Sequence, residues 1–259
     1  MNLARAGVVL ERNALNYRRT WRGSIIVSFV SPILFLAAMG LGLGSLISHG
    51  QHRLVAGYPY LDYLAPGLLA ATAMQTAALE TMYPILAKLM WDKIYESILA
   101  TPVRVAEVFI GELSWICVRL LIVTTTFFTV MVAFRVVHTP AGILAIPIAV
   151  LTGLAFGGAF MAYSSNQRND SGFAALNRFV VIPLFLLAGT FFPITNLPAV
   201  FQAIAWLTPL AHGVALTRAV TLATPMAPPA ALGHLAVLVA YAAVGFVIGR
   251  RNFERRLTV

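Results

Sequence analysis

Residues 113–134 read LSWICVRLLIVTTTFFTVMVAF, and this stretch decides the fold because it holds one charged side chain, Arg119. A helix that crosses the hydrocarbon core of a bilayer needs about 20 mostly apolar residues, each rising about 1.5 Å. The whole chain has the same character: 59% of its 259 residues are hydrophobic, 10% are charged, and the mean hydropathy is +0.84. A soluble domain carries about 25% charged residues. The sequence therefore predicts an all-α polytopic membrane protein.

Six apolar stretches are long enough to form transmembrane helices. Their predicted bounds are about 24–48, 63–87, 108–134, 140–165, 178–192 and 230–249. Residues 1–22 are predicted to form an amphipathic helix that lies in the membrane interface, because arginines and apolar residues recur on different faces at helical spacing. Residues 23–259 then form the six-span transmembrane domain.

Residues 179–217 carry no formal charge, but they are too long for one crossing and too rich in proline for one helix. Each proline removes a backbone donor and clashes with the preceding turn. The prolines are Pro183, Pro193, Pro198 and Pro209. Broken backbone is tolerated in lipid only where protein or a water-filled cavity covers it. We therefore expect the fifth span to end near residue 192 and residues 193–217 to form outer re-entrant helices.

The chain carries 18 Lys and Arg residues against 9 Asp and Glu, and their placement predicts its orientation. Positive residues gather in the cytoplasmic segments of membrane proteins. With the N-terminus inside, Arg53, Arg135 and Arg218 fall outside and Arg119 falls within a span. We therefore expect a multi-pass protein of the bacterial plasma (inner) membrane with both termini cytoplasmic. This bias also accounts for the basic balance, so we expect membrane lipid and no nucleic acid as a partner.

The loop at 88–104 lies on the predicted inner side and reads KLMWDKIYESILATPVR. Its mixed charges and two aromatic residues predict a short amphipathic helix parallel to the membrane. Thr101 and Pro102 end this helix, because the residue before a proline is pushed out of the helical region. A short, aromatic, mixed-charge helix at the inner face is suited to docking a soluble partner.

Two blocks of the chain resemble the membrane permeases of type-2 ABC exporters, especially their NodJ-like branch. The first block is the inner loop just quoted, together with Gly111 and Glu112. The second block is FPITNLP at 192–198, followed by WLTPLAH at 206–212 and by Arg218. The six-span order extends the resemblance over essentially the whole chain.

This resemblance implies that the inner loop is a coupling helix seated in a cleft of a separate ABC ATPase subunit. It gives that role to Trp91, Lys93, Glu96, Thr101 and Pro102. It also implies that the proline-rich segment closes the pathway as an outer gate. The gate residues would be Phe192, Pro193, Leu197, Pro198, Trp206, Pro209 and His212. Two permeases would pair as a homodimer or heterodimer, and the partner ATPase would bind ATP and Mg.

The residues themselves also indicate that ATP hydrolysis belongs to a partner. A phosphate-binding Walker A loop needs a Gly-rich turn that ends in Lys followed by Ser or Thr. Lys88 and Lys93 are the only lysines, and neither follows such a turn. Cys117 is the single cysteine, and the five histidines show no metal-ligand spacing. We therefore expect no catalytic residue, metal site or cofactor site in this chain.

Glu80 and Arg119 are charged residues within predicted spans, and such residues are functional candidates because burying a charge is costly. By helical rise, both lie roughly 10 Å inside the inner boundary of the membrane. They can pair with each other or line the substrate path, and Arg119 can also reach the inner surface. Small residues at Gly153 and Gly157 likewise permit close packing either within one chain or across a dimer.

The sequence best fits the permease subunit of an ATP-driven exporter. It would move an amphipathic or lipid-like substrate (drug, lipid or lipid-linked saccharide) outward by alternating access. An ion-coupled secondary transporter is the alternative, although Glu80 alone is thin support for that class. An intramembrane enzyme is a further alternative, disfavoured because Ser164 and Ser165 lack the flanking glycines of an exposed nucleophile.

Overall fold

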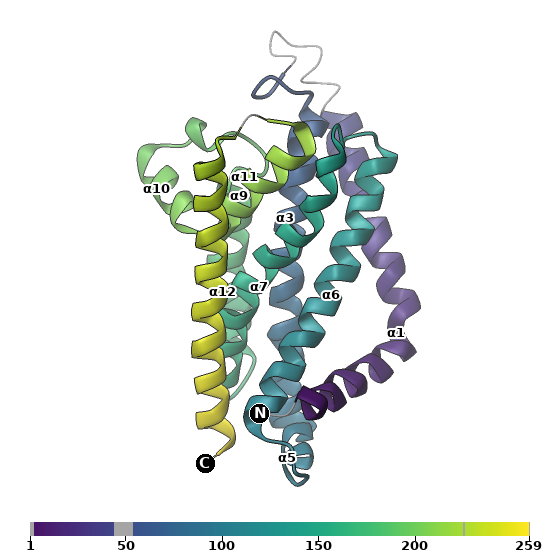
Figure 1. The fold of residues 1–259 in the computed structure, drawn as a ribbon, viewed down its shortest axis with the longest axis vertical. Coiled ribbons are helices and arrows are strands. Elements are labelled where there is room, and N and C mark those ends of the chain that lie inside the picture. The colour runs from purple at the N-terminus through teal and green to yellow at the C-terminus, as the bar shows by residue number, and fades with distance from the viewer. Residues whose placement is uncertain (1–2, 44–53, 225, 259) are drawn as a thin grey trace.

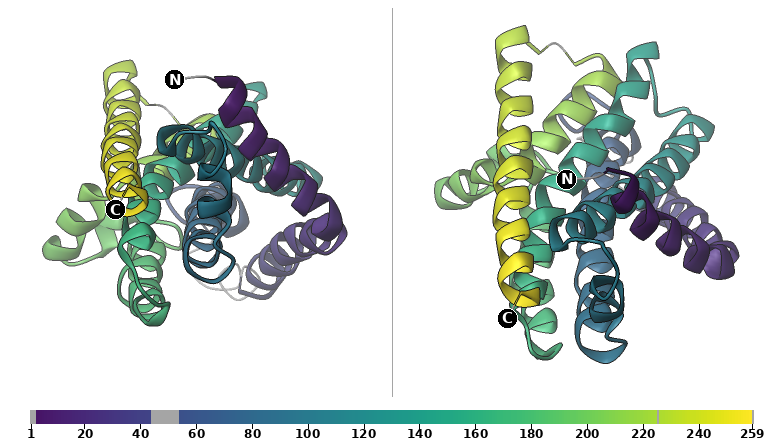
Figure 2. Two further views of the ribbon diagram at one scale, coloured as in Figure 1. Left: turned by 90° about the horizontal axis from the view of Figure 1, so that it is seen from below. Right: turned by 60° about the horizontal axis from the view of Figure 1, so that its bottom comes forward.

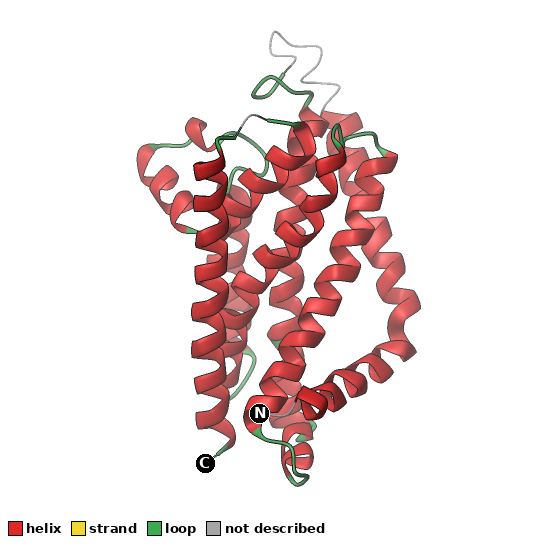
Figure 3. Cartoon of the chain, in the orientation of Figure 1, coloured by secondary structure: helices red, strands yellow, loops and turns green. Residues whose placement is uncertain are grey.

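The computed structural model describes residues 3–43, 54–224 and 226–258, which fold into helices joined by loops (Figures 1 and 3). Residues 1, 2, 44–53, 225 and 259 of the predicted domains lie outside the described residues, and they include 44–48 of the first predicted span and Arg53. The helices, with π and 3-10 turns labelled η, are α1 (Leu3–Ala37), η1 (Ala38–Leu43), α3 (Tyr60–Thr81), α4 (Tyr83–Leu86), η2 (Ala87–Trp91), α5 (Ile94–Leu99), α6 (Val105–Ala133), η3 (Pro140–Leu144), α7 (Ala145–Asn166), α8 (Ser171–Leu176), η4 (Asn177–Val181), α9 (Ile182–Leu187), η5 (Ile194–Asn196), α10 (Ala199–Leu207), α11 (Pro209–Leu222) and α12 (Pro228–Leu257).

Several helices are long and apolar enough to cross a membrane. Four of the described helices pass this criterion: Ala4–Ala37, Val105–Ala133, Pro140–Asn166 and Pro228–Leu257. A fifth crossing results if α10 and α11, which meet at 83°, are counted as one broken span. The predicted helical membrane fold is therefore confirmed, and the count of six spans stays a prediction.

α3 lies at the centre of the bundle and packs against α6, α7 and α11. Its sequence is rich in alanine, and small side chains let neighbouring helices approach closely. Most of its residues between Tyr60 and Ala78 are buried. Because protein rather than lipid surrounds it, α3 can carry polar residues such as Thr72 and Gln75, which a lipid-facing helix would exclude.

α1 is one helix in the structure, but it changes direction partway along (Figure 1). Its first half lies across the end of the bundle that carries α5, and its second half rises beside α6. Both ends of the chain also lie at this α5 end (Figure 1). The view from below in Figure 2 places α1 and α12 on opposite sides of the bundle.

The helix expected at 63–87 is broken at Met82. α3 ends at Thr81, Met82 leaves helical geometry with φ −75° and ψ −83°, and α4 starts at Tyr83. Pro84 explains the break, because its ring nitrogen has no hydrogen to donate to the preceding turn. The chain then passes through η2 into the inner loop, and this turn directs Lys88 toward α6.

The helix expected at 178–192 starts and ends earlier, from Ser171 to Leu187, and it is shorter than the four helices named above. The π turn η4 interrupts its middle. It ends before Gly189, whose φ of +80° turns the chain in a way that favours glycine. α12, by contrast, continues past the predicted end of the last span to Leu257, and within this extension Arg250 pairs with Glu254 one turn later.

The small-residue face of α7 packs within the chain. A Cβ added to Gly158 would come within 2.5 Å of the carbonyl carbon of Gly245 in α12. A Cβ on Gly153 would meet Leu120 of α6 at 2.6 Å. Of the two readings left open by the sequence, the structure supports packing between helices of one chain.

Candidate functional site

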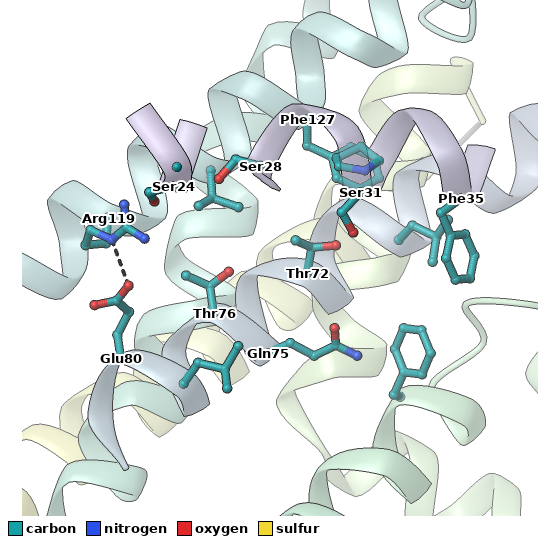
Figure 4. Close-up of a pocket in the computed structure, with 16 residues that line it drawn as sticks. Ser24, Ser28, Ser31, Phe35, Thr72, Gln75, Thr76, Glu80, Arg119 and Phe127 are labelled. Carbon is teal, nitrogen blue, oxygen red and sulfur yellow. Dashed lines mark hydrogen bonds and ion pairs between the residues drawn. The ribbon is translucent and has the colours of Figure 1, made fainter. Parts of the chain in front are cut away.

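A cavity of about 450 Å³ opens between α1, α3, α6 and α9, and we call it the groove (Figure 4). Polar side chains line it from two helices: Ser24, Ser28 and Ser31 on α1, and Thr72, Gln75 and Thr76 on α3. Glu80 and Arg119 mark one end, and the aromatic rings of Phe35 and Phe127 lie toward the other (Figure 4). Phe185 of α9 also lines the groove. The groove is therefore amphipathic along its length.

Glu80 and Arg119 form an ion pair at the end of the groove nearer α5, with 2.7 Å between Glu80 Oε1 and Arg119 Nε (Figure 4). Their side chains are 21% and 11% exposed. The guanidinium also lies over the ring of Tyr17, 4.5 Å from its centroid. The residues therefore pair, as one reading of the sequence has it, and they also line a cavity. That this cavity is the substrate path stays a prediction.

A second cavity of about 310 Å³ adjoins the groove toward the α5 end, and we call it the inner chamber. Ser24, Glu80 and Arg119 line both cavities. The remaining lining residues of the inner chamber are Asn13, Asn16, Tyr17, Thr20, Pro84, Lys88 and Trp115. The ion pair therefore stands where the two cavities meet.

Lys88 closes one wall of the inner chamber by pairing with Glu112 of α6. Lys88 Nζ lies 2.7 and 2.8 Å from the two carboxylate oxygens, and the Glu112 side chain is only 1% exposed. The amide of Asn13 donates to Glu112 at 3.1 Å and accepts from Lys88 at 3.0 Å. This network joins the first half of α1 to the start of the inner loop and to α6.

The residues expected to couple to an ATPase lie on an exposed turn at the α5 end. The side chain of Trp91 is 60% exposed. Lys93 adopts left-handed geometry with φ 49° just before α5, and its ammonium lies 3.9 Å from the Glu96 carboxylate. Both charged side chains are more than 60% exposed. The three side chains are therefore accessible to a soluble partner.

Hydrogen bonds hold the C-terminal end of this turn in place. Thr101 Oγ1 donates to the carbonyl of Ile98 at 2.6 Å, which caps α5. The carbonyl of Pro102 accepts a 2.6 Å hydrogen bond from the Arg5 guanidinium of α1. The α5 turn is thus tied directly to the N-terminal helix.

Tyr95, which sequence reasoning did not single out, anchors the other face of α5. It is fully buried, and its ring packs edge-on against Phe253 of α12 with 5.7 Å between centroids. Burial, with the nearby Glu112 carboxylate, raises the pKa of the Tyr95 phenol well above its ordinary value. Tyr95 therefore stays neutral, and it connects α5 to the end of α12.

The residues expected to form an outer gate lie in the segment from η5 to α11, at the end of the bundle opposite α5 (Figure 1). Pro193, Pro198 and Pro209 each stand at the start of a helix, where a missing N–H costs little. Phe192 and Leu197 flank these starts and are partly exposed. The prolines thus explain the breaks between the three short helices.

Trp206 and His212 are brought together, with His234 of α12 as a third member that sequence reasoning missed. His212 Nε2 donates to the Trp206 carbonyl at 2.8 Å, and its Nδ1 lies 2.7 Å from Nδ1 of His234. The Trp206 ring stacks on the His234 ring at 5.7 Å. The hydroxyl of Tyr241 donates to the next carbonyl, that of Leu207, at 2.6 Å. These contacts hold the end of α10 to α11 and α12.

Arg218 fixes the turn that follows α9. Its guanidinium donates to the Gly189 carbonyl at 2.9 Å and to the Tyr63 carbonyl, and it lies 3.7 Å from the centroid of the Tyr63 ring. Phe191, two residues after Gly189, packs against Phe185 at 5.0 Å. Arg218 therefore holds in place the turn that packs Phe191 against Phe185, a residue that lines the groove.

The polar lining of α1 was missed, although its spacing is a readable signal. The polar lining residues of this helix are Asn13, Asn16, Tyr17, Thr20, Ser24, Ser28 and Ser31, and apart from the adjacent Asn16 and Tyr17 they are three or four residues apart. That spacing places them on one face of a helix. The stripe crosses the boundary between the predicted interfacial helix and the first predicted span, so neither segment shows it as a whole.

Comparison with known proteins gives one consistent family. The ABC-2 type transporter family profile matches residues 5–222. The chain is 30% identical to Nodulation protein J of Rhizobium leguminosarum bv. viciae, over 96% of this chain and 93% of that protein. It is 32% identical to Nodulation protein J of Bradyrhizobium diazoefficiens, over 96% and 92%, and 21% identical to the inner membrane transport permease YadH of Escherichia coli, over 76% and 74%. The chain therefore belongs to the ABC-2 type transporter family.

Proposed function

We propose that the chain is the permease of an ATP-driven exporter and that the groove carries an amphipathic or lipid-like substrate outward. The observation that carries the proposal is the groove itself. The polar side chains on α1 and α3 can bind the head group of an amphiphile, and the aromatic rings can contact its apolar chain. The relative YadH is named an inner membrane transport permease, which supports a transport role for this chain.

The chain is proposed to cross the bacterial inner membrane six times, with both termini in the cytoplasm. The four long helices would supply four crossings, and α3 and the helix from Ser171 to Leu187 the other two. α10 and α11, bent by 83°, would form the re-entrant outer segment. Both chain ends lie at the same end of the bundle as α5, which supports this arrangement.

ATP hydrolysis is proposed to come from a separate ABC ATPase subunit that binds ATP and Mg and docks on the α5 turn. Two permeases would pair, each with its ATPase. Closure of the ATPases would push on α5, and Tyr95, Arg5 and Asn13 would pass that movement to α12 and α1. Tilting of these helices would open the groove alternately to the two sides of the membrane.

Replacing Lys93 and Glu96 together by alanine is expected to weaken docking of the ATPase at least tenfold without unfolding the permease. Both side chains are exposed, so removing them changes the stability of the fold little. Charged side chains at an interface can each contribute strongly to the binding free energy, so their loss weakens docking. Co-purification of the ATPase with the permease from membranes measures the effect.

The matched control is the double variant Arg250→Ala and Glu254→Ala, which removes an exposed ion pair of the same kind from α12. It is expected to retain the ATPase. Full retention of the ATPase by the Lys93 and Glu96 double variant would contradict the docking assignment. Transport in vesicles that continues after ATP depletion, but stops when ion gradients are dissipated, would instead favour the secondary transporter.

A further inference from the structure

Two further cavities follow one another along the seam between α6 and α12, and we call them together the lateral crevice. The larger cavity, of about 790 Å³, lies next to α5, and the smaller one has a volume of about 330 Å³. The lining residues include Ala106, Ile110, Leu113 and Cys117 on α6, and Ala242, Phe246, Arg250 and Glu254 on α12. On each helix these residues are three or four apart, so they share one face. The two cavities therefore lie one beyond the other along the same two helix faces.

The lateral crevice lies on the side of α6 that faces away from the inner chamber. Trp115 and Arg119 line the inner chamber, whereas Leu113 and Cys117 line the crevice. Residues two apart point to nearly opposite sides of a helix, because each residue turns the helix by about 100°. α1, which lines both the groove and the inner chamber, also lies on the opposite side of the bundle from α12 (Figure 2). The crevice is therefore separate from the cavities assigned to the substrate.

The smaller cavity of the crevice is lined mainly by apolar side chains, with Leu154 and Gly158 of α7 among them. The neighbouring surface of α12 exposes apolar residues such as Val244 and Val247. An apolar surface of this kind contacts acyl chains in a bilayer. From Ala106 to Cys117 the crevice extends roughly 16 Å along α6, about half of a hydrocarbon core that is about 30 Å thick. Its length therefore matches one leaflet.

The larger cavity carries two guanidinium groups, those of Arg104 and Arg250. Arg104 is exposed, and it forms no ion pair with any of the described residues. Arg250 binds Glu254 through Nε at 2.8 Å, so its terminal nitrogens can donate to a second acceptor. Glu107, the other carboxylate of the cavity, is 1% exposed and accepts the backbone N–H of Arg104 at 3.0 Å.

The end of α12 makes the surroundings of the larger cavity strongly positive. From residue 250 onward, the helix sequence RRNFERRL holds four arginines and one glutamate. Arginine binds phosphate through two parallel hydrogen bonds, and basic clusters at the inner surface of a membrane attract anionic lipids. A phosphate that carries a net negative charge is therefore complementary to this end of the crevice.

We infer that the lateral crevice binds an anionic phospholipid of the inner leaflet, with its phosphate at Arg104 and Arg250 and an acyl chain between α6 and α12. The choice of leaflet rests on the proposed orientation of the chain. The bound lipid fills a gap that side chains leave open, and it joins the start of α6 to the end of α12. It is a resident of the fold rather than a cargo, because the crevice shares no lining residue with the groove or the inner chamber.

The test measures binding of dioleoylphosphatidylglycerol and dioleoylphosphatidylcholine to the delipidated full chain in detergent by native mass spectrometry. The two lipids share their acyl chains, but the choline cation neutralises the second one. Phosphatidylglycerol is expected to bind about tenfold more tightly. It is also expected to raise the midpoint of thermal unfolding, because a ligand that binds only the folded state stabilises it. Sodium phosphate at the same concentration, which lacks acyl chains, is expected to leave the midpoint unchanged.

Replacing Arg104 and Arg250 together by glutamine is expected to weaken phosphatidylglycerol binding about tenfold, through the loss of charged hydrogen bonds to the phosphate. Arg104 is exposed and the Arg250 side chain is 43% exposed, so the fold is expected to survive. The matched control is Arg18→Gln with Arg19→Gln, which removes the same charge from exposed positions of α1 outside the crevice. It is expected to bind both lipids as the unmodified chain does.

Ala242→Leu tests the apolar part of the crevice independently. It keeps both arginines and fills part of the smaller cavity, so binding of both lipids is expected to weaken.

Equal binding of the two lipids, or an Arg104 and Arg250 variant that binds phosphatidylglycerol as well as the Arg18 and Arg19 control does, would overturn the inference. An equal rise of the midpoint in sodium phosphate would also overturn it, because the site would then take a free anion. A third contrary result is an Arg104 and Arg250 variant that keeps its lipid but no longer co-purifies with the ATPase. That outcome would assign this surface to the ATPase instead.

Discussion

Gly158→Ala is expected to destabilise the protein by about 3 kcal/mol, the upper end of what overpacking costs. The added Cβ would stand 2.5 Å from the carbonyl carbon and 2.8 Å from the carbonyl oxygen of Gly245, and backbone atoms cannot rotate away. α7 and α12 would have to separate along their shared face. Thermal unfolding in nanodiscs is expected to show a midpoint lower by roughly 10 °C.

Gly157→Ala is the matched control, one residue along the same helix. Its added Cβ would meet Ile116 at 3.7 Å, which is ordinary van der Waals contact. Alanine also favours helix over glycine by about 1 kcal/mol. We therefore expect its midpoint to stay unchanged or to rise. Equal midpoints for the two variants would show that α12 does not pack against α7 at Gly158.

Lys88→Met is expected to cost about 3–5 kcal/mol, because it leaves the Glu112 carboxylate buried without the cation that pairs with it. The same network links α1 to α6, so the first half of α1 is expected to detach as well. Hydrogen exchange of α1, measured together with the unfolding midpoint, reports both effects.

Lys93→Met provides the comparison, since its side chain is 67% exposed and its ion pair spans 3.9 Å. Its effect on stability is expected to stay below about 1 kcal/mol. Adding Glu112→Leu to Lys88→Met is expected to restore most of the lost stability, because no buried charge then remains. A Lys88→Met variant as stable as Lys93→Met would rule out a stabilising role for the buried pair.

Hydropathy and proline placement predicted the helical membrane fold and the breaks at Pro193, Pro198 and Pro209, but not the break at Met82. α3 shows why. Its alanine-rich sequence is only moderately apolar, and it is helical at the centre of the bundle because neighbouring helices shield its polar residues. The break at Met82 depends on Pro84, whose effect on the direction of the chain is not visible in a hydropathy pattern. Average hydropathy therefore locates spans better than it locates their ends.

The candidate site was predictable where a charge stood in an apolar run. Glu80 and Arg119 stood out in this way, and the structure pairs them. The pair of Lys88 and Glu112 was not predicted, because Lys88 lies in the loop, Glu112 lies near the start of the third predicted span, and only the turn through η2 joins them. Serine and threonine are common in membrane helices, so the stripe on α1 becomes meaningful only beside the facing row on α3.

α10 exposes apolar side chains on most of its surface, among them Val200, Phe201, Ile204 and Leu207. The last three carbonyls of α10 nevertheless receive donors from within the chain: Thr208 donates to Ala205, His212 to Trp206 and Tyr241 to Leu207. Water usually donates hydrogen bonds to the last carbonyls of a helix. A carbonyl that lies in hydrocarbon without a donor costs several kcal/mol. The end of α10 therefore needs no water at these three carbonyls, which suits a short helix that presents apolar side chains to lipid.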